Sequence, residues 1–348
     1  SYMDIAHNTK HLNTISIIIN IMLQLDILDK KIMYELDLNA RISASQLAKK
    51  LKKSKETVNF RINRLIKNEY IKGFYTVFNT SKLGWYYIKF YIKFKNITPE
   101  KERKLYDYIQ KQSHVAYLAS VEGPYDCMLL IMVRSSLDMV KFQDPFMKLY
   151  GGFIQEKNLV TFLTTHRINQ RFLFEGEQKE DWFYPIEIKD YELDDIEKNI
   201  LELISTNARM PLIEIAEKLK IDHKVVKYRL KKLEKDNIIL AYVTSPNFNK
   251  LGLTFFQINI SLKDSSIRKE LIQFFNSTNK CLFAMELLGK YDVLAELHVK
   301  GSEELRKIID EFRNKFVDKY NDYDISTITK EYVVVWGPFY EPNKEIAP

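Results

Sequence analysis

An internal repeat is the feature that most limits what this chain can fold into. Residues of the first copy recur 168 positions later from Leu25 to Gly84, and the turn that begins at Gly123 recurs 166 positions later. The matching segments are Leu25-Asp26 with Leu193-Asp194, Asn39-Ala40-Arg41 with Asn207-Ala208-Arg209, Lys82-Leu83-Gly84 with Lys250-Leu251-Gly252, and Gly123-Pro124-Tyr125-Asp126 with Gly289-Lys290-Tyr291-Asp292. Chance does not hold such a register, so the chain is a duplication.

Two segments lie outside the repeat. Residues 1–24 have no counterpart in the second copy, and their apolar residues at helical spacing predict an extension helix that packs on a partner or on the core. Residues 169–192 form the linker between the copies. They are rich in aromatic residues, so we expect part of this linker to pack as a strand.

Composition indicates an ordinary globular protein. Of the 348 residues, 46% are hydrophobic, which is enough to bury a substantial core. The two cysteines are too few for a disulfide framework, and no apolar run is long enough for a membrane span. We therefore expect a cytoplasmic protein that does not bind membranes.

The positive charge is concentrated in two places that are equivalent in the repeat. Residues 49–67 carry eight Lys or Arg and one Glu, and residues 217–235 carry eight Lys or Arg and three acidic residues. The net charge of the whole chain is +7, so the remainder is negative overall. Two focused basic segments favour an anionic polymer, double-stranded DNA, as the partner. One such segment alone is more typical of a solvated helix surface.

Each basic segment ends a predicted helix-turn-helix. In the first copy, apolar spacing predicts helices over 26–38, 44–51 and 55–68, with Ser43 and Ser54 as N-caps. Asp222 takes the cap position of the last helix in the second copy. Three short helices joined by tight turns, the last one basic, are typical of this DNA-binding motif. The β-rich stretches 70–79 and 238–247 that follow predict wing strands that stabilise the helices and reach the flanking DNA backbone.

The outward residues of the last helix and its turn are the candidate DNA contacts. Asn and Arg suit base readout in the first copy, whereas Lys in the second copy suits phosphate. Arg61 and Arg229 match between the copies, and each either contacts DNA or pairs within its own domain. The candidates are Lys53, Lys55, Thr57, Asn59, Phe60, Arg61, Asn63, Arg64, His223, Lys224, Lys227, Tyr228, Lys231 and Lys232.

The second half of each copy has the order β-α-β-β-α-β, which predicts a ferredoxin-like sandwich. Its two helices cover one sheet face, and a second sheet is the usual cover for the other. The fold class is therefore α+β, with two winged helix-turn-helix domains and two ferredoxin-like sandwich domains in tandem. The predicted boundaries are 1–24 for the extension, 25–80 and 193–248 for the winged domains, 81–168 and 249–340 for the sandwiches, and 169–192 for the linker.

These motifs together resemble the Lrp/AsnC (feast/famine) family of bacterial and archaeal transcriptional regulators. The residues that carry the likeness are Leu25-Asp26, Asp29, Ile32, Asn39-Ala40-Arg41, Leu47-Ala48, Ser54, Val58, Arg61, Leu65 and Tyr70-Ile71. The resemblance covers almost all of 25–168 and 193–336. It implies sequence-specific DNA binding, an archaeal source, and self-association through the sandwiches, either as a homodimer or as a pseudo-dimer within one chain. Family members normally carry one copy, so their usual larger assembly does not carry over.

The resemblance also implies an amino-acid effector at the hairpin turns of the sandwiches. Glycine lets the backbone approach a ligand closely, and Asp accepts hydrogen bonds from an ammonium group. The alternative is a plain hairpin, because Gly, Pro and Asp are turn residues in any case. The effector candidates are Gly123, Tyr125, Asp126, Gly289, Tyr291 and Asp292.

Two other functions are consistent with the same architecture. Siroheme decarboxylases share both halves and occur as fused pairs, but their His- and Arg-rich stretch corresponds here to residues 115–118 and 282–285, which contain neither. His114 lies just before the first stretch and is more typical of a structural histidine. A chromatin-like protein that coats DNA is the second alternative. The sequence shows no metal-ligand spacing and no phosphate-binding loop, so we expect no enzyme activity, catalytic residue, cofactor or metal.

Overall fold

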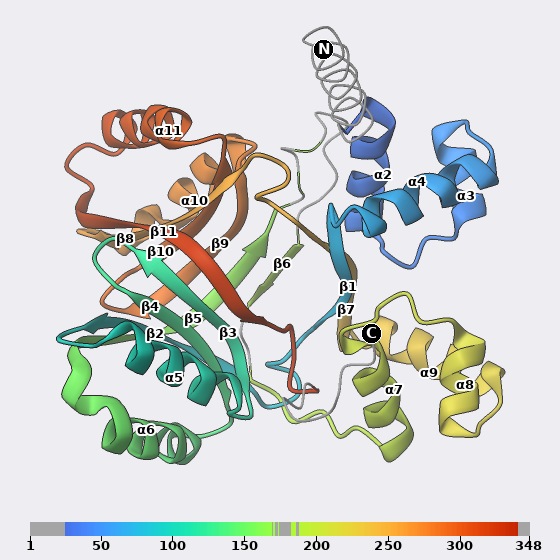
Figure 1. The fold of residues 1–348 in the computed structure, drawn as a ribbon, viewed down its shortest axis with the longest axis horizontal. Coiled ribbons are helices and arrows are strands. Elements are labelled where there is room, and N and C mark those ends of the chain that lie inside the picture. The colour runs from blue at the N-terminus through green and yellow to red at the C-terminus, as the bar shows by residue number, and fades with distance from the viewer. Residues whose placement is uncertain (1–24, 169, 171–172, 174–181, 186–187, 340–348) are drawn as a thin grey trace, which may run out of the picture.

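The structure is a computed structural model that describes the chain apart from residues 1–24, 169, 171–172, 174–181, 186–187 and 340–348. The extension helix predicted over 1–24 and much of the linker therefore lie outside the described residues. Figure 1 shows a body of strands and covering helices beside two small helical domains. No helix in the described ranges has both the length and the apolar character of a membrane span.

The two copies have the same order of elements. The first copy contains α2 (Ile27–Leu38), α3 (Ala44–Leu51), α4 (Lys55–Lys67), β1 (Ile71–Phe78), β2 (Tyr86–Phe94), α5 (Pro99–Gln110), β3 (Val115–Glu122), β4 (Cys127–Val133), α6 (Ser136–Tyr150) and β5 (Ile154–Arg167). The second copy contains α7 (Asp195–Ser205), α8 (Leu212–Leu219), α9 (His223–Lys235), β7 (Ile239–Pro246), β8 (Thr254–Leu262), α10 (Arg268–Ser277), β9 (Cys281–Gly289), β10 (Val293–Val299), α11 (Ser302–Lys315) and β11 (Tyr320–Val334). Between them, β6 (Trp182–Pro185) falls within the linker and pairs with β5.

Side-chain caps determine where the helices of the DNA-binding half begin. Ser43 and Ser54 each accept a hydrogen bond from the backbone three residues later, and Asp222 accepts one from Lys224. These bonds satisfy backbone N–H groups that have no partner inside the helix. The three predicted N-caps are therefore confirmed.

The sandwich halves join edge to edge into one closed ring of eight strands. Each half has the ferredoxin-like order, β5-β2-β4-β3 in the first copy and β11-β8-β10-β9 in the second. The β3 strand pairs with β11, and β5 pairs with β9. We call this the strand ring. Helices α5 and α6 lie outside it on one copy, and α10 and α11 lie outside it on the other (Figure 1). The face that we expected a second sheet to cover therefore lines the interior.

Equivalent residues of the two copies meet in the ring interior. Lys89 donates a hydrogen bond to Gln257, its counterpart 168 residues later. Tyr91 donates to its counterpart Asn259 at 2.8 Å. The hydroxyls of Tyr125 and Tyr291 are hydrogen-bonded at 2.7 Å. Contacts between counterparts occur only near a local two-fold axis, so the chain is a pseudo-dimer of its own two halves.

The predicted wing strands do not form separate wings. Strand β1 pairs antiparallel with β7, so each copy supplies one strand of a shared two-stranded sheet. This sheet lies between the helical domains and the strand ring (Figure 1). The expectation that these strands reach flanking DNA is wrong for their buried residues Val77, Thr76 and Val243.

Two arginines tie the helical domains together across the same axis. Arg41 donates to the carbonyl oxygens of Ala208 and Met210 at 2.6 and 3.1 Å. Its counterpart Arg209 donates in return to the carbonyl oxygens of Ala40 and Ile42. These reciprocal bonds and the shared sheet hold the two domains at one separation.

We predict that Gly123→Ala lowers the free energy of unfolding by about 1–3 kcal/mol. Gly123 has a φ of +136°, and a Cβ there lies 2.6 Å from the carbonyl oxygen of Ile325 on the neighbouring strand β11. Urea unfolding followed by circular dichroism measures the change. Gly152→Ala is the matched control, because a Cβ at that position meets nothing within 4 Å. Equal stability of the two variants contradicts the close approach of the hairpin to β11.

Candidate nucleic-acid interface

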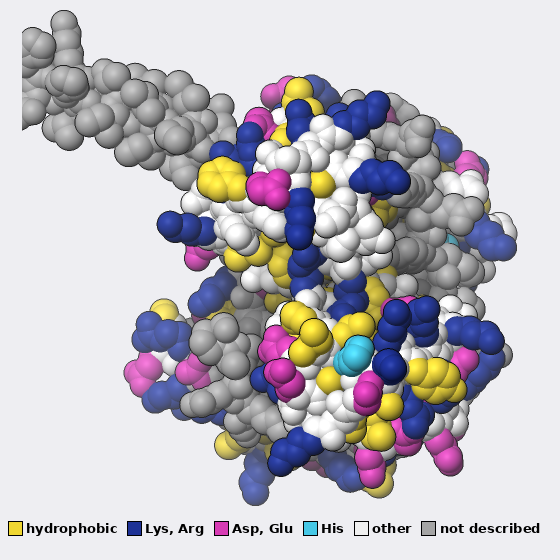
Figure 2. All heavy atoms as spheres, turned by 90° about the vertical axis from the view of Figure 1, so that its right-hand side faces the viewer, with side chains coloured by type: hydrophobic (Ala, Val, Ile, Leu, Met, Phe, Trp, Pro, Cys, Tyr) yellow, Lys and Arg dark blue, Asp and Glu magenta, His cyan; other side chains and the backbone are white. Residues whose placement is uncertain are grey.

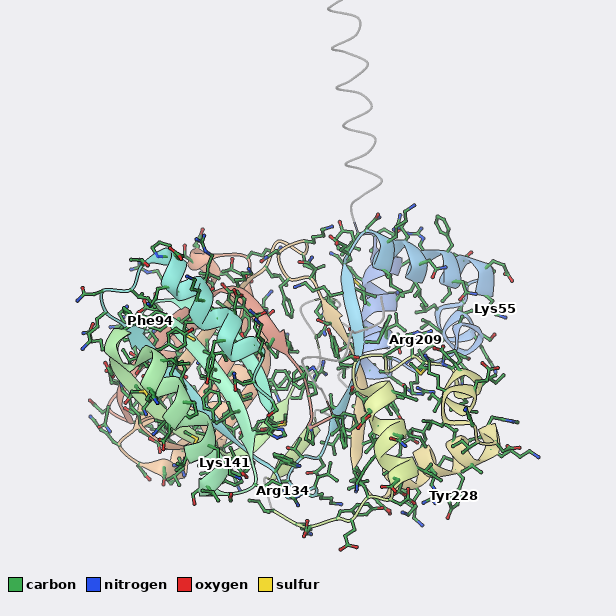
Figure 3. All side chains as sticks on the ribbon, turned by 60° about the horizontal axis from the view of Figure 1, so that its bottom comes forward. Lys55, Phe94, Arg134, Lys141, Arg209 and Tyr228 are labelled. Atoms are coloured by element: carbon green, nitrogen blue, oxygen red, sulfur yellow. The ribbon has the colours of Figure 1, made fainter. Side chains whose placement is uncertain are left out.

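Helices α4 and α9 present corresponding outward faces on the side of the molecule away from the strand ring. Lys55 on α4 and Tyr228 on α9 point outward from the two domains in Figure 3, and Arg209 lies between the domains. Figure 2 looks onto this side and shows Lys and Arg side chains over both domains and between them. We call α4 and α9 the reading helices.

Most of the predicted contact residues are accessible. The burial pattern leaves ten of the fourteen exposed and places Thr57, Arg61, Arg64 and Lys232 at intermediate burial. The exposed ones are Lys53, Lys55, Asn59, Phe60, Asn63, His223, Lys224, Lys227, Tyr228 and Lys231. Among the four, Thr57 lies at the start of α4, where its hydroxyl is 2.9 Å from the hydroxyl of the N-cap Ser54.

An exposed aromatic ring occupies the same position on both reading helices. Phe60 and Tyr228 are counterparts, and each is 65% exposed. Exposure of so large an apolar surface is not needed for packing. A ring in this place can contact thymine methyl groups or the sugars of a groove.

A buried acid in each domain engages the basic residues nearest the core. Asp29 on α2 is fully buried and pairs with Arg61 at 3.1 Å and with Arg64. Arg61 also pairs with Asp26 at 2.5 Å. The first copy thus uses two arginines of its reading helix to neutralise acids of the first helix.

The second copy repeats this arrangement with different residue types. Glu197, the counterpart of Asp29, is 1% exposed and pairs with Arg229 at 3.2 Å and with Lys232 at 2.7 Å. The hydrogen bond to Glu197 raises the pKa of Lys232. Arg61 and Arg229 therefore pair within their own domains, which was one of the two alternatives from the sequence. Arg64 and Lys232 do the same, which the sequence interpretation missed.

The hairpin turns proposed for an effector are engaged within the fold. Asp126 accepts hydrogen bonds from Phe94 N at 2.7 Å and from Lys93 at 2.8 Å. Asp292 accepts corresponding bonds from Leu262 N at 2.8 Å and Arg268 at 2.6 Å.

The glycines and tyrosines of these turns also contact protein. Gly123 and Gly289 lie close to the carbonyl oxygens of Ile325 and Leu159. Tyr125 and Tyr291 bond each other on the two-fold axis, and Tyr291 also donates to Asp324. Of the six effector candidates, the structure thus brings together Tyr125 and Tyr291, and the glycines and aspartates of each turn contact other protein groups.

Two other features bear on chemistry. His114 lies against Trp85, with ring centroids 4.6 Å apart, and burial lowers its pKa.

A cavity of about 140 Å³ lies at the end of the strand ring that faces β7. The sequence interpretation missed this cavity, because its lining comes from strands of both copies. No cluster of three or more metal-ligating side chains occurs among the described residues.

Comparison with known sequences agrees with the geometry. The winged helix-turn-helix DNA-binding family matches residues 25–72 and 193–239. The HTH-type transcriptional regulator LrpA of Pyrococcus horikoshii is 33% identical over 120 residues, which are 34% of this chain and 83% of LrpA. The HTH-type transcriptional regulator LrpB of Bacillus subtilis is 27% identical over 140 residues, which are 40% of this chain and 91% of LrpB.

Comparison with solved structures bears on the whole chain. The crystal structure of the siroheme decarboxylase NirDL has a TM-score of 0.62 and covers 90% of this chain and 94% of its own. The two sequences are 12% identical. The likeness therefore shows that two fused copies of this architecture fold in the same way, and it does not extend to activity.

We predict that Asp29→Asn destabilises the first helical domain by roughly 1–3 kcal/mol. The change leaves Arg61 and Arg64 without their buried carboxylate, and the cost is smaller than for a fully buried pair because both arginines reach solvent. Chemical unfolding measures it. Glu303→Gln on α11, where Glu303 and Lys307 form an exposed pair, is the control and should be neutral. An unfolding curve for Asp29→Asn identical to the wild type is incompatible with a structural role for these pairs.

Proposed function

Because this chain belongs to the Lrp/AsnC family of HTH-type transcriptional regulators, we propose that it binds double-stranded DNA through α4 and α9 together. The observation that carries the proposal is the repeated outward face. In each copy, the inner basic residues are neutralised by a buried acid, while an exposed aromatic ring and exposed polar or basic side chains remain on the surface. The reciprocal arginine bonds hold the two faces at a fixed separation, as two contacts on one duplex require.

The two reading helices have different roles in this proposal. Asn59 and Asn63 of α4 are exposed, and an amide can bond adenine in two places. Their counterparts on α9 are Lys227 and Lys231, which suit phosphate. The first copy then supplies most of the sequence discrimination, and the second supplies affinity that is less dependent on sequence.

Modulation by an amino acid at the hairpin turns is the second part of the proposal. Support comes from the family resemblance and from the convergence of Tyr125 and Tyr291. An effector there would share Asp126 and Asp292 with existing partners, since each already accepts two hydrogen bonds.

A regulator accounts for the observations better than a decarboxylase does. The strand segments 115–118 and 282–285 contain no His or Arg to act on an iron tetrapyrrole. We therefore propose that the chain is not an enzyme.

We predict that Asn59→Ala and Lys227→Ala affect DNA binding in different ways. Asn59→Ala reduces the preference for a target over an unrelated duplex by about 1–3 kcal/mol, because it removes a base contact. Lys227→Ala weakens binding to both duplexes equally and lowers the slope of log K against log salt by about 1, because it removes one phosphate contact. The target is first defined by genome-wide immunoprecipitation, and fluorescence anisotropy then measures both quantities.

Lys307→Ala on α11 is the control for this pair, because that helix lies on the far side of the strand ring from the reading helices (Figure 1). It removes one positive charge and should leave both measurements unchanged. Equal weakening by Asn59→Ala and Lys227→Ala on all sequences contradicts the division of roles. Uniform protection of DNA in footprinting at one concentration identifies a coating protein instead.

We predict that this protein does not change the absorbance spectrum of an added iron tetrapyrrole. The reason is the absence of His and Arg from the two strand segments 115–118 and 282–285. A titration of the protein into ferric uroporphyrin, followed at the Soret band, tests this. A saturable spectral shift with one equivalent of protein favours the decarboxylase-like alternative.

A further inference from the structure

The cavity at the β7 end of the strand ring combines aromatic walls with buried charge. Its lining includes Phe283 and Trp336, whose rings stack with centroids 5.2 Å apart. Lys89, Glu296 and Glu331 also line it, from β2, β10 and β11. Ordinary cores are apolar, so three ionisable side chains around one cavity need a separate reason.

Each ionisable residue of the cavity, whichever copy it comes from, has an uncharged residue at the equivalent position of the other copy. The pairs are Lys89 with Gln257, Glu296 with Leu130, Glu331 with Thr165, Arg167 with Val333, and His298 with Met132. The same strands therefore fold with neutral residues at these positions, and the ring does not need the charges to close.

Burial makes these charges costly. It raises the pKa of Glu296 to about 7 and lowers the pKa of Lys89 to about 8, and it also raises the pKa of Glu331. Glu296 interacts electrostatically with Lys89, whereas Glu331 interacts with Lys72 and Tyr117. Retained charges that reduce stability are typical of binding sites.

The basic groups Lys89 and Arg167 of the lining already donate to neighbouring side chains. Lys89 already donates to Gln257, and Arg167 donates to Asp37 at 2.6 Å. Gln170 is fully buried, and its Oε1 has no partner among the described residues although its Nε2 donates to Asp37 at 2.8 Å. An ammonium group in this cavity would find acceptors in Gln170 Oε1 and in the carboxyl groups of Glu296 and Glu331.

We propose that the cavity binds a small organic cation, a primary amine on a flat apolar body about the size of benzene. The ammonium group would bond Glu296, Glu331 or Gln170, and the body would lie against Phe283 and Trp336. A cavity of roughly 150 Å³ holds benzene, which matches this size. Aromatic faces also attract cations. This site is separate from the hairpin turns, and binding there does not depend on DNA.

The site is linked to one reading domain. Asp37 belongs to α2 and is held by Arg167, by Gln170 and by Thr244 of β7 at 3.4 Å. Arg167, Gln170 and Thr244 also line the cavity. The equivalent of Asp37 in the second copy is Ser205, so only the first domain has this link. An occupant that bonds Gln170 therefore acts on the domain of α4, a consequence that rests on the proposed function.

Isothermal titration calorimetry of the full chain without DNA tests the site. The probes are benzylamine, benzyl alcohol and benzoate, which share one ring and differ in charge. We expect one benzylamine per chain, binding by benzyl alcohol at least tenfold weaker, and no heat from benzoate. Benzoate binding as tight as benzylamine, or no binding by any probe, overturns the proposal.

Variants identify the acceptors. Glu296→Gln and Glu331→Gln should each weaken benzylamine binding at least tenfold, because each removes one of the two carboxyl groups of the cavity. Glu303→Gln on the exposed face of α11 is the matched control and should bind normally. Unchanged affinity in both cavity variants, with the fold intact by circular dichroism, also overturns the proposal.

A DNA experiment then separates the two proposals. Benzylamine should shift the affinity for DNA of the wild type and not of Glu296→Gln. If calorimetry shows binding but no DNA is bound under any condition, the amine site stands and the regulator proposal fails. If DNA is bound and no probe gives heat, the amine site fails alone.

Discussion

Contact between equivalent residues across the local two-fold axis is the constraint on which the rest of the structure depends. The bonds Lys89–Gln257, Tyr91–Asn259 and Tyr125–Tyr291 lie inside the strand ring, and the reciprocal bonds of Arg41 and Arg209 lie between the helical domains. One half cannot make any of them alone. Each half also leaves a sheet face and two sheet edges open, and an open face or edge is a site for unwanted association. Pairing of the two halves covers the open sheet faces and joins the open sheet edges.

Covalent fusion lets the two halves differ while the axis is kept. In a symmetric homodimer, every charge placed near the axis is duplicated, and two buried charges of one sign then repel each other. In this chain, Lys89 meets a neutral Gln257, and Glu296 has a leucine as its counterpart. A single set of charges can therefore surround one cavity on the axis. The same freedom explains why an Asn-rich and a Lys-rich reading helix occur on one rigid unit.

Local features of the fold could be predicted from the sequence, and contacts between distant elements could not. The N-caps Ser43, Ser54 and Asp222 act within a few residues, so the sequence is sufficient to find them. The order of strands also follows from the apolar pattern. Closure of the ring, pairing of β1 with β7, and the cavity depend on how two copies meet. The apolar periodicity of one copy does not show how the two copies contact each other.

In the candidate interface, too, local features could be predicted from the sequence and contacts between elements were missed. Outward positions on α4 and α9 follow from helical spacing, and most are exposed. Arg64 and Lys232 lie at intermediate burial because Asp29 and Glu197 face them from another helix. The sequence did contain a signal for this pairing: an acid and a basic pair recur together 168 residues apart, and such joint recurrence indicates mutual contact rather than a shared external partner.

Asymmetry of the reading helices has a consequence for how the protein sits on DNA. A symmetric dimer binds a palindrome equally well in two orientations, because rotation about its axis exchanges identical faces. Here the rotation exchanges an asparagine-bearing face for a lysine-bearing one, while Arg41 and Arg209 keep their distance fixed. Under the proposed division of roles, only one orientation places Asn59 over the bases that it would read. The link from the cavity to Asp37 enters the same half, so under both proposals a ligand in the cavity would bear on the face that discriminates between sequences and would leave the lysine-bearing face as a constant anchor.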